Sequence, residues 1–214
     1  MLNVGLTGGI ASGKSTVARL LMEKGARLID FDELSHAAEE PDGPVWIEIV
    51  RHFGNEILQA DRTIDRRKLG DIVFANQEKR ELLNRLVHPA VFENWRRRIE
   101  EIRTVQPDAI ILSDIPLLIE AGMKPMVDLV LLVYVPREEQ LARLMARNGF
   151  GYKDAEMRIA SQMPIGEKLP FADIVVHNDG SPEETRKALD SVWKGLIQRE
   201  RQLRGETLCS PANH

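Results

Sequence analysis

The chain has 214 residues, of which 43% are hydrophobic and 29% charged, so it is long enough to bury a substantial core in one domain with small insertions. Its formal net charge of −4 argues against non-specific nucleic-acid binding, which needs a basic surface. No apolar run is long enough to span a bilayer, and the single cysteine, Cys209, cannot form an internal disulfide, so we expect a soluble cytoplasmic protein with no membrane partner.

A phosphate-binding sequence lies near the amino end, directly after the apolar run at residues 2–6. The residues from Gly8 to Ser15 spell a complete G-x-x-x-x-G-K-S motif, and a helical pattern opens at Lys14. Glycines let the loop curl so that its main-chain N–H groups point at phosphate oxygens, and the following helix N-terminus favours the same anion. In this motif Lys14 reaches the terminal phosphates, and the Ser15 hydroxyl coordinates the Mg²⁺ that accompanies them. Thr16 adds a second hydroxyl one residue into the helix.

Five short apolar runs alternate with longer helical patterns, which predicts a parallel, doubly wound α/β sheet. Several of these runs lack polar alternation, as expected for strands that are covered on both faces. Because ligands bind beyond the carboxyl ends of such strands, polar residues that follow different strands should converge on one crevice. The predicted strands are residues 2–6, 26–29, 109–112, 129–135 and 173–176.

Two carboxylates, Asp30 and Asp32, follow the second predicted strand. Asp30 with Glu33 forms a D-x-x-E capping box, which would only satisfy the N–H groups of the next helix. Phosphoryl transfer to a hydroxyl needs a carboxylate that orients the nucleophile and accepts its proton late in the transfer. A second acid at a helix start is also common for dipole reasons, so the residues alone leave Asp32 open to either role.

Residues 45–105 interrupt the alternating pattern with a mainly helical insertion, which could form an acceptor-binding lobe. Within it, Pro89 should end one helix or begin the next, and this puts His88 at a boundary where its ring could face a ligand. The alternative is that His88 is a cap or a packed surface residue.

The third predicted strand runs into Asp114, two residues before Pro116. A carboxylate at the end of a strand beside a phosphate loop can hold a Mg²⁺-bound water. The alternative is that Asp114 merely caps the turn before Pro116. The presence of the loop favours the first interpretation.

Residues 136–147 and 153–163 predict two helices joined by a Gly-rich elbow, an arrangement that could serve as a lid. A closing lid excludes water, which would compete with the acceptor hydroxyl, and brings arginines onto the transferring phosphoryl group. Arg143 and Arg147 share one face of the first helix and are open to phosphate or adenine contact, or to simple solvation. Lys168 and Asn178 flank the last strand, where a base could lie against the loop.

These motifs, spread over most of the chain, combine into one pattern. They are Leu6 to Ser15, Asp30-x-Asp32 with His36, Asp65-Arg66, His88-Pro89, Asp114-x-Pro116-Leu117-Leu118-x-Glu120, Gln140-x-x-Arg143-x-x-x-Arg147, Gln162, and Ala172-Asp173 through Asn178. In this order they closely resemble the dephospho-CoA kinase family from about residue 2 to residue 178. The resemblance implies transfer of the ATP γ-phosphoryl group to the ribose 3′-hydroxyl of dephospho-CoA, the last step of coenzyme A synthesis. It also implies a nucleoside-monophosphate-kinase-like P-loop fold with a helical CoA-binding lobe and a lid.

The resemblance assigns roles to individual residues and resolves the choice between the two carboxylates in favour of Asp32, which it puts at the acceptor hydroxyl. It implies catalysis by Asp32, Lys14 and Arg143; ATP binding by Gly8, Gly9, Ala11, Ser12, Gly13, Lys14, Ser15, Thr16, Arg147 and Asn178; acceptor binding by Asp32, Arg66, His88, Asp114 and Leu117; and Mg²⁺ binding by Ser15 and, through water, Asp114. Ala11 stands where many relatives have Gly, and it should allow the loop if its φ is negative.

The expected organisation is a single P-loop kinase unit over residues 1–214. Its core comprises residues 1–44, 106–140 and 170–205, with the acceptor-binding insertion at 45–105, the lid at 141–169 and a frayed tail at 206–214. The expected small-molecule substrates are ATP and dephospho-CoA, and the chain should be a monomer or a weak homo-oligomer.

Three other functions compete with this interpretation. A kinase for a nucleoside or a sugar stays open, because the acceptor pocket cannot be derived from the sequence. A GTP-gated switch should carry an Asn-Lys-x-Asp guanine reader after a late strand, whereas residues 177–180 read His-Asn-Asp-Gly. A nucleic-acid ATPase is disfavoured by the acidic balance and by the lack of a second motor domain.

Overall fold

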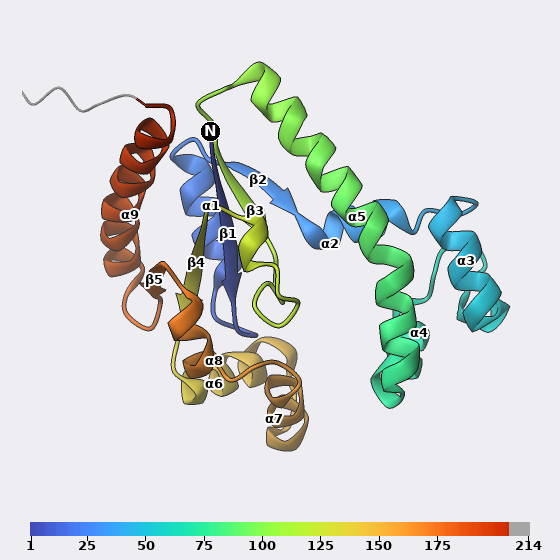
Figure 1. The fold of residues 1–214 in the computed structure, drawn as a ribbon. Coiled ribbons are helices and arrows are strands. Elements are labelled where there is room, and N and C mark those ends of the chain that lie inside the picture. The colour runs from blue at the N-terminus through green and yellow to red at the C-terminus, as the bar shows by residue number, and fades with distance from the viewer. Residues whose placement is uncertain (206–214) are drawn as a thin grey trace, which may run out of the picture. The chain divides into compact units, whose positions relative to one another are not determined.

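Five strands form one sheet with the spatial order β2-β3-β1-β4-β5 in the computed structural model, which describes residues 1–205 (Figure 1). The strands are β1 (Leu2–Gly8), β2 (Arg27–Asp30), β3 (Ile110–Asp114), β4 (Leu129–Tyr134) and β5 (Ile174–His177). The central strand β1 pairs in parallel with β3 and β4, and β4 pairs in parallel with β5. The predicted doubly wound α/β sheet is thus confirmed, with strand ends shifted by one or two residues.

Nine α-helices and three short 3₁₀-helices connect these strands within residues 1–205. The α-helices are α1 (Lys14–Glu23), α2 (Phe31–Ala38), α3 (Pro44–Phe53), α4 (Arg66–Ala75), α5 (Gln77–Val105), α6 (Arg137–Asn148), α7 (Tyr152–Ala160), α8 (Ile165–Lys168) and α9 (Pro182–Leu203), and the 3₁₀-helices are η1 (Asn55–Ile57), η2 (Lys124–Met126) and η3 (Leu169–Phe171). The chain divides into two compact units, one formed by residues 1–29 with the chain from 102 onward and the other by residues 30–101. The second unit thus starts earlier than residue 45, where the sequence pattern changes.

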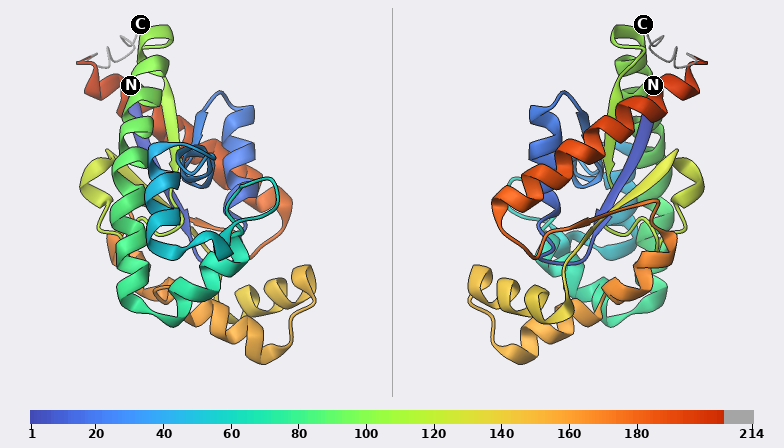
Figure 2. Two further views of the ribbon diagram at one scale, coloured as in Figure 1. Left: turned by 90° about the vertical axis from the view of Figure 1, so that its right-hand side faces the viewer. Right: turned by 90° about the vertical axis from the view of Figure 1, so that its left-hand side faces the viewer.

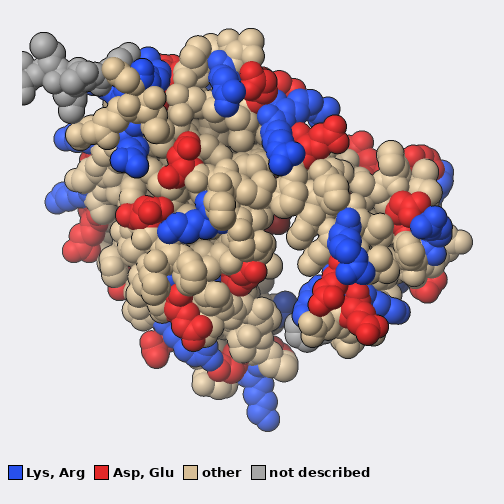
Figure 3. All heavy atoms as spheres, viewed as in Figure 1, with Lys and Arg blue, Asp and Glu red and all other residues tan. Residues whose placement is uncertain are grey.

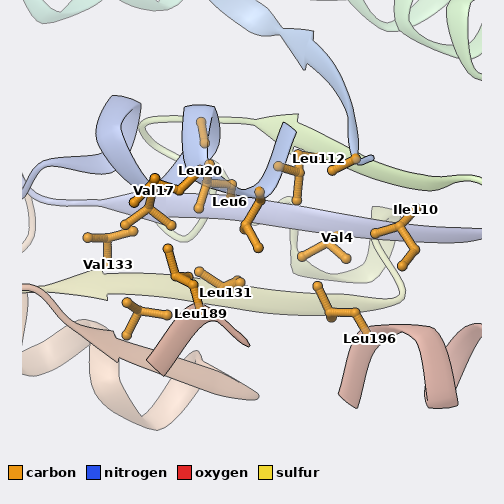
Figure 4. Close-up of a cluster of buried hydrophobic side chains, with 14 of the residues drawn as sticks. Val4, Leu6, Val17, Leu20, Ile110, Leu112, Leu131, Val133, Leu189 and Leu196 are labelled. Atoms are coloured by element: carbon orange, nitrogen blue, oxygen red, sulfur yellow. The ribbon is translucent and has the colours of Figure 1, made fainter. Parts of the chain in front are cut away.

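One face of the sheet is covered by α1 and α9, and the main hydrophobic core lies there. Alternate residues of β1, including Val4 and Leu6, point to this face, where Figure 4 shows them together with Val17 of α1 and with Leu189 and Leu196 of α9. Burial of this contiguous cluster stabilises the fold, at about 25 cal/mol per Å² of apolar surface removed from water. The residues of this cluster therefore serve chiefly as a scaffold, which fixes the position of the loop that follows β1.

The opposite face of the central strand is closely packed at Gly5. A Cβ on this glycine would clash with Leu118 and would lie 3.0 Å from the side chain of Val127. The segment that follows β3 therefore lies directly against the backbone of β1. This contact requires a residue without a side chain at position 5.

Helix α9 begins with a capping box. The Ser181 hydroxyl accepts from the Glu184 N–H at 3.3 Å, and the Glu184 carboxylate accepts from the Ser181 N–H at 2.7 Å. Pro182 occupies the first turn, where its missing N–H costs nothing.

Helix α5 runs unbroken through Pro89, so the predicted helix boundary at His88–Pro89 is wrong. Val87, Val91 and Trp95 are spaced four residues apart and are buried, and the Trp95 ring packs against Phe31 of the same unit at a centroid distance of 5.6 Å. Pro89 lies on the exposed side of the helix. The buried stripe therefore holds the helix together across one missing main-chain hydrogen bond.

Helices α6 and α7 lie side by side as a helical pair, which Figure 2 shows from two sides. Leu144 of α6 is buried with Ala155 and Ile159 of α7 in a small separate cluster. The two predicted helices and their glycine elbow are therefore present; Gly149 adopts a left-handed φ of 68° at the end of α6.

The surface drawn in Figure 3 intersperses Lys and Arg with Asp and Glu. This mixed surface agrees with the acidic net charge of the chain. Among residues 1–205, no helix combines the length and the apolar character needed to cross a membrane.

Candidate active site

The loop between β1 and α1 has the curled backbone that its glycines predict. Gly13 has a left-handed φ of 84°, and an added Cβ there would clash with the Asn178 side chain. A Cβ on Gly8 would lie 2.6 Å from the Ser12 Oγ and 2.9 Å from the Val133 carbonyl oxygen. At both positions neighbouring atoms lie too close to the main chain for a side chain, so glycine is required.

Ala11 has a φ of 59°, so the negative φ under which an alanine should fit the loop without strain is not what the structure shows. An L-residue in this left-handed region costs about 1–2 kcal/mol relative to its ordinary conformations, because its Cβ crowds the following carbonyl. The loop therefore holds a strained alanine at its tip, where the surrounding contacts must compensate for the strain.

Four main-chain N–H groups of the loop have no acceptor within residues 1–205. They belong to Ala11, Gly13, Lys14 and Ser15. The neighbouring amides are engaged, since Ser12 donates to Gly9 O at 3.1 Å and Thr16 to Gly13 O at 3.0 Å. A run of unpaired donors at a helix N-terminus is a site for an anion.

Lys14, at the first residue of α1, forms an ion pair with Asp114, the last residue of β3. The two strands place them together, because Leu6 of β1 is in register with Asp114. Both side chains are largely shielded, with 19% and 9% of their surface exposed. Ser15 and Thr16 are exposed at the start of α1, while the Ser12 hydroxyl is buried and has no hydrogen-bond partner among the described residues.

Asn178 follows β5 and is tied to the loop by its side chain. Its Nδ2 donates to Ser12 O at 2.8 Å, and its Oδ1 accepts from the Thr185 hydroxyl at 3.0 Å. Thr185 is 3% exposed and was not among the residues predicted for the site. In the sequence, Thr185 could have been noticed because it is a hydroxyl residue at a core-facing position of α9, one helical turn before Leu189.

Of the two arginines predicted to contact ATP, Arg143 contacts this part of the fold and Arg147 does not. Its Nη2 donates to Asn178 O at 2.8 Å, and its Nε donates to Glu139 at 2.7 Å. A Cβ built on Gly13 would lie 3.9 Å from Arg143 Nη1, so the guanidinium is next to the phosphate loop. Arg147 is exposed in the last turn of α6 and donates instead to its neighbour Asn148 at 2.8 Å.

In the unit of residues 30–101, Asp30 and Asp32 differ in what their carboxylates do. Asp30 caps α2 by accepting from the N–H groups of Asp32 at 2.8 Å and Glu33 at 3.4 Å, as its capping interpretation predicts. The Asp32 side chain is exposed and has no hydrogen-bond partner among the described residues. Asp32 is therefore the carboxylate that is not used by the helix cap.

Arg66 and His88 lie in the same unit and have different partners. Arg66 donates to Glu39 at 2.7 Å, and burial raises the pKa of the Glu39 carboxyl although Arg66 opposes the shift. The His88 ring packs on Phe92 at 5.6 Å, and desolvation lowers its pKa, so the ring is neutral at pH 7.

Two further residues lie beside strand ends in the first unit. Leu117, in the turn after β3, is 45% exposed and is free to contact a ligand. Lys168, in contrast, has a fully buried side chain paired with Glu120 at 2.7 Å, so it is not available to a base beside the loop.

No group of three or more metal-ligating side chains occurs within the described part of the chain. The Ser15 hydroxyl and the Asp114 carboxylate are oxygen ligands of the kind Mg²⁺ prefers, and two protein groups are enough where substrate phosphates supply the rest. The donor set therefore fits a Mg²⁺ ion that arrives with a nucleotide.

Comparison with known proteins places this chain in a family. The dephospho-CoA kinase family profile matches residues 2–184. The dephospho-CoA kinases of Syntrophus aciditrophicus and Carboxydothermus hydrogenoformans are 56% and 49% identical to the chain, covering 98% and 89% of it and 89% and 94% of their own lengths.

Solved structures agree with this assignment. The crystal structure of TT1252 from Thermus thermophilus superposes with a TM-score of 0.77 at 37% identity, covering 91% of this chain and 97% of its own. A dephospho-CoA kinase from Campylobacter jejuni gives a TM-score of 0.69 at 27% identity, covering 92% and 98%. The chain belongs to the dephospho-CoA kinase family, the enzymes that use ATP to phosphorylate the 3′-hydroxyl of dephospho-CoA in the final step of coenzyme A biosynthesis.

Proposed function

We propose that the loop between β1 and α1 holds the triphosphate of ATP while dephospho-CoA is phosphorylated. The observation that supports this most directly is that the N–H groups of Ala11, Gly13, Lys14 and Ser15 have no acceptor among the described residues. Lys14 adds a positive charge at the start of the same helix. Donors and charge together suit an anion with several phosphates.

In the proposed reaction the 3′-hydroxyl oxygen attacks the γ-phosphorus, and the bond from that phosphorus to the β–γ bridging oxygen breaks. The hydroxyl proton passes to the Asp32 carboxylate, and ADP leaves with the negative charge that Lys14 and Arg143 neutralise. The exposed Asp32 carboxylate, which no cap or ion pair of residues 1–205 engages, supports this assignment.

We assign Mg²⁺ to the Ser15 hydroxyl and, through water, to Asp114. When bound, the ion would screen the charge of the β- and γ-phosphates. Asp114 pairs with Lys14 in the structure, so ATP binding must rearrange this pair. Asp114 can exchange one cation for the other because its carboxylate has two oxygens.

The remaining assignments are divided between nucleotide and acceptor. Asn178 and Arg147 are proposed for the adenosine end of ATP, and Gly8, Gly9, Ser12, Gly13 and Thr16 complete its loop. Arg66, His88 and Leu117 are proposed for dephospho-CoA: a cation for its phosphates, a neutral ring and an exposed apolar side chain.

The organisation of the chain stays a prediction as well. We propose residues 141–169 as a lid and residues 45–105 as the acceptor-binding insertion, in an enzyme of the cytoplasm that is monomeric or weakly self-associating. The separate apolar cluster of α6 with α7 supports a lid that moves as one body.

The proposal is tested by incubating the protein with Mg-ATP and a panel of hydroxyl compounds that includes dephospho-CoA, a nucleoside and a sugar. We expect a product with the mass of coenzyme A and an equal amount of ADP. The control is Lys14→Met, which should not bind Mg-ATP measurably in calorimetry. Phosphorylation of another acceptor with none of dephospho-CoA would refute the assigned acceptor site, and full activity in excess chelator would refute the role of Mg²⁺.

A further inference from the structure

Both polar main-chain atoms of Ile10, at the tip of the phosphate loop, are bound by glutamine side chains. Gln162, two residues after the end of α7, accepts from the Ile10 N–H at 3.0 Å. Gln140, in α6, donates from Nε2 to the Ile10 carbonyl oxygen at 2.8 Å. One residue of the loop is thus held from two sides by segments about 130 and 150 residues away in the chain.

The approach of Gln140 is close and buried. Its side chain is 2% exposed, and a Cβ added to Gly9 would clash with its amide nitrogen. Gly9 therefore leaves the space through which the amide reaches the loop. A buried amide that donates at 2.8 Å is a specific contact, since leaving its partner unsatisfied costs more than the bond itself is worth.

The hydrogen bond to the Ile10 carbonyl also sets the direction of a phosphate-binding donor. The carbonyl of Ile10 and the N–H of Ala11 belong to one planar trans peptide, so the two groups point in opposite directions. When Gln140 holds the carbonyl, the Ala11 N–H must point to the other side. That N–H is one of the four that lack an acceptor within residues 1–205.

The glutamines act next to the strained residue of the loop. Ala11 keeps a φ of 59°, which an alanine leaves readily unless its flanking peptides are held. If Ala11 returned to a negative φ, the amides that follow it would turn away from their common direction. Fixing Ile10 therefore opposes this relaxation.

We propose that Gln140 and Gln162 are positioning residues that preset the phosphate loop for ATP by holding the main chain of Ile10. This proposal rests on the proposed ATP site. The two glutamines do not touch phosphate. They act through the loop backbone, so their removal should weaken nucleotide binding more than turnover.

The first test compares Gln140→Met and Gln162→Met, which keep the side-chain length and remove the amide. We expect the KM for ATP and the Kd for Mg-ATP to rise about five- to tenfold in each, as for the loss of one hydrogen bond, with kcat changed less than about twofold. The matched control is Gln198→Met on the exposed face of α9, which should leave all three constants unchanged.

The second test uses the strain at Ala11. Glycine has no penalty at a positive φ, so adding Ala11→Gly to Gln140→Met should recover about half or more of the affinity lost in Gln140→Met. A merely structural role of Gln140 would not produce this rescue, because Ala11→Gly adds no contact to α6.

The third measurement is direct. Hydrogen exchange followed by NMR should show faster exchange of the Ile10 amide in Gln162→Met than in the unchanged protein, and no change in Gln198→Met. If the folded Gln162→Met protein keeps both its Ile10 protection and its ATP affinity, the proposal is overturned, whatever happens to the more buried Gln140 variant. Normal Mg-ATP binding by Lys14→Met would instead overturn the ATP site itself, which separates the two failures.

Discussion

Substitution of the two neighbouring carboxylates at the start of α2 should separate an effect on stability from an effect on catalysis. Asp30 accepts two main-chain N–H groups, at 2.8 and 3.4 Å, so Asp30→Ala should cost about 1 kcal/mol, the usual value of such a cap. For a chain of this size that corresponds to a fall in Tm of about 2–4 °C, with kcat changed little. Asp32→Asn should do the reverse: kcat falls about 10²- to 10⁴-fold as the proton acceptor is lost, and Tm stays constant.

The assay couples ADP release to a spectroscopic signal at saturating Mg-ATP and dephospho-CoA, and calorimetry measures Mg-ATP binding to each variant. Asp32→Asn should bind Mg-ATP with unchanged affinity, because the substitution touches only the acceptor side of the reaction. Near-normal kcat in Asp32→Asn would refute the assignment of the base. A larger loss of kcat in Asp30→Ala than in Asp32→Asn would show that the roles are reversed.

Three further predictions concern stability and can be measured by urea unfolding. The pKa of the Glu39 carboxyl in the folded protein lies above 4.5, so ionisation of this carboxyl weakens the fold. Relative to Glu39→Gln, the unchanged protein should therefore lose stability as the pH rises from 4.5 through the raised pKa. A difference in stability between the two proteins that does not change with pH would contradict this. Lys168→Met should lower the free energy of unfolding by about 2 kcal/mol, because it breaks an ion pair in which Lys168 is buried and Glu120 is partly exposed. Adding Glu120→Gln to this variant should restore most of the lost stability. A further, additive loss of stability in the double variant would contradict the pairing. Pro89→Ala should stabilise α5 by about 1 kcal/mol or more by restoring a main-chain donor, and a loss of stability would mean that the proline is needed.

The sequence predicts the sheet well because its signals there are local. The apolar runs that became β1 and β4 are bounded by glycine, proline or charged residues, and strand burial on both faces removes the need for long-range information. The error at Pro89 has the opposite origin. The rule that proline ends a helix is local, but the buried stripe of Val87, Val91 and Trp95 exists only when the unit folds, and it outweighs one lost hydrogen bond.

The site was predictable where a residue type has one use in a motif, as for Lys14 and Ser15. It was not predictable where a contact joins distant segments. Nothing local to Ala11 indicates a positive φ, which is imposed by the closure of the whole loop. Thr185 has ordinary helical surroundings in the sequence, and only the fold brings it to Asn178. The buried pair of Lys168 with Glu120 was missed for the same reason.

The basic side chains assigned to phosphate share one property: each has a carboxylate partner. Lys14 pairs with Asp114, Arg143 with Glu139, and Arg66 with Glu39. An incoming phosphate must therefore replace or share an existing partner, so each cation contributes the difference between two ion pairs rather than a full new one.

The unpaired loop amides are different, because no acceptor among residues 1–205 competes for them. Each of them exchanges a bond to water for a charge-assisted hydrogen bond to a phosphate oxygen, and several of them act on one ligand only if it presents several phosphate oxygens at once. The balance of paired cations and unpaired amides thus selects a polyphosphate over a single phosphate. Inorganic phosphate should compete with Mg-ATP only at concentrations far above those of ADP, and equal competition by the two anions would show that charge, rather than the curled backbone, determines binding.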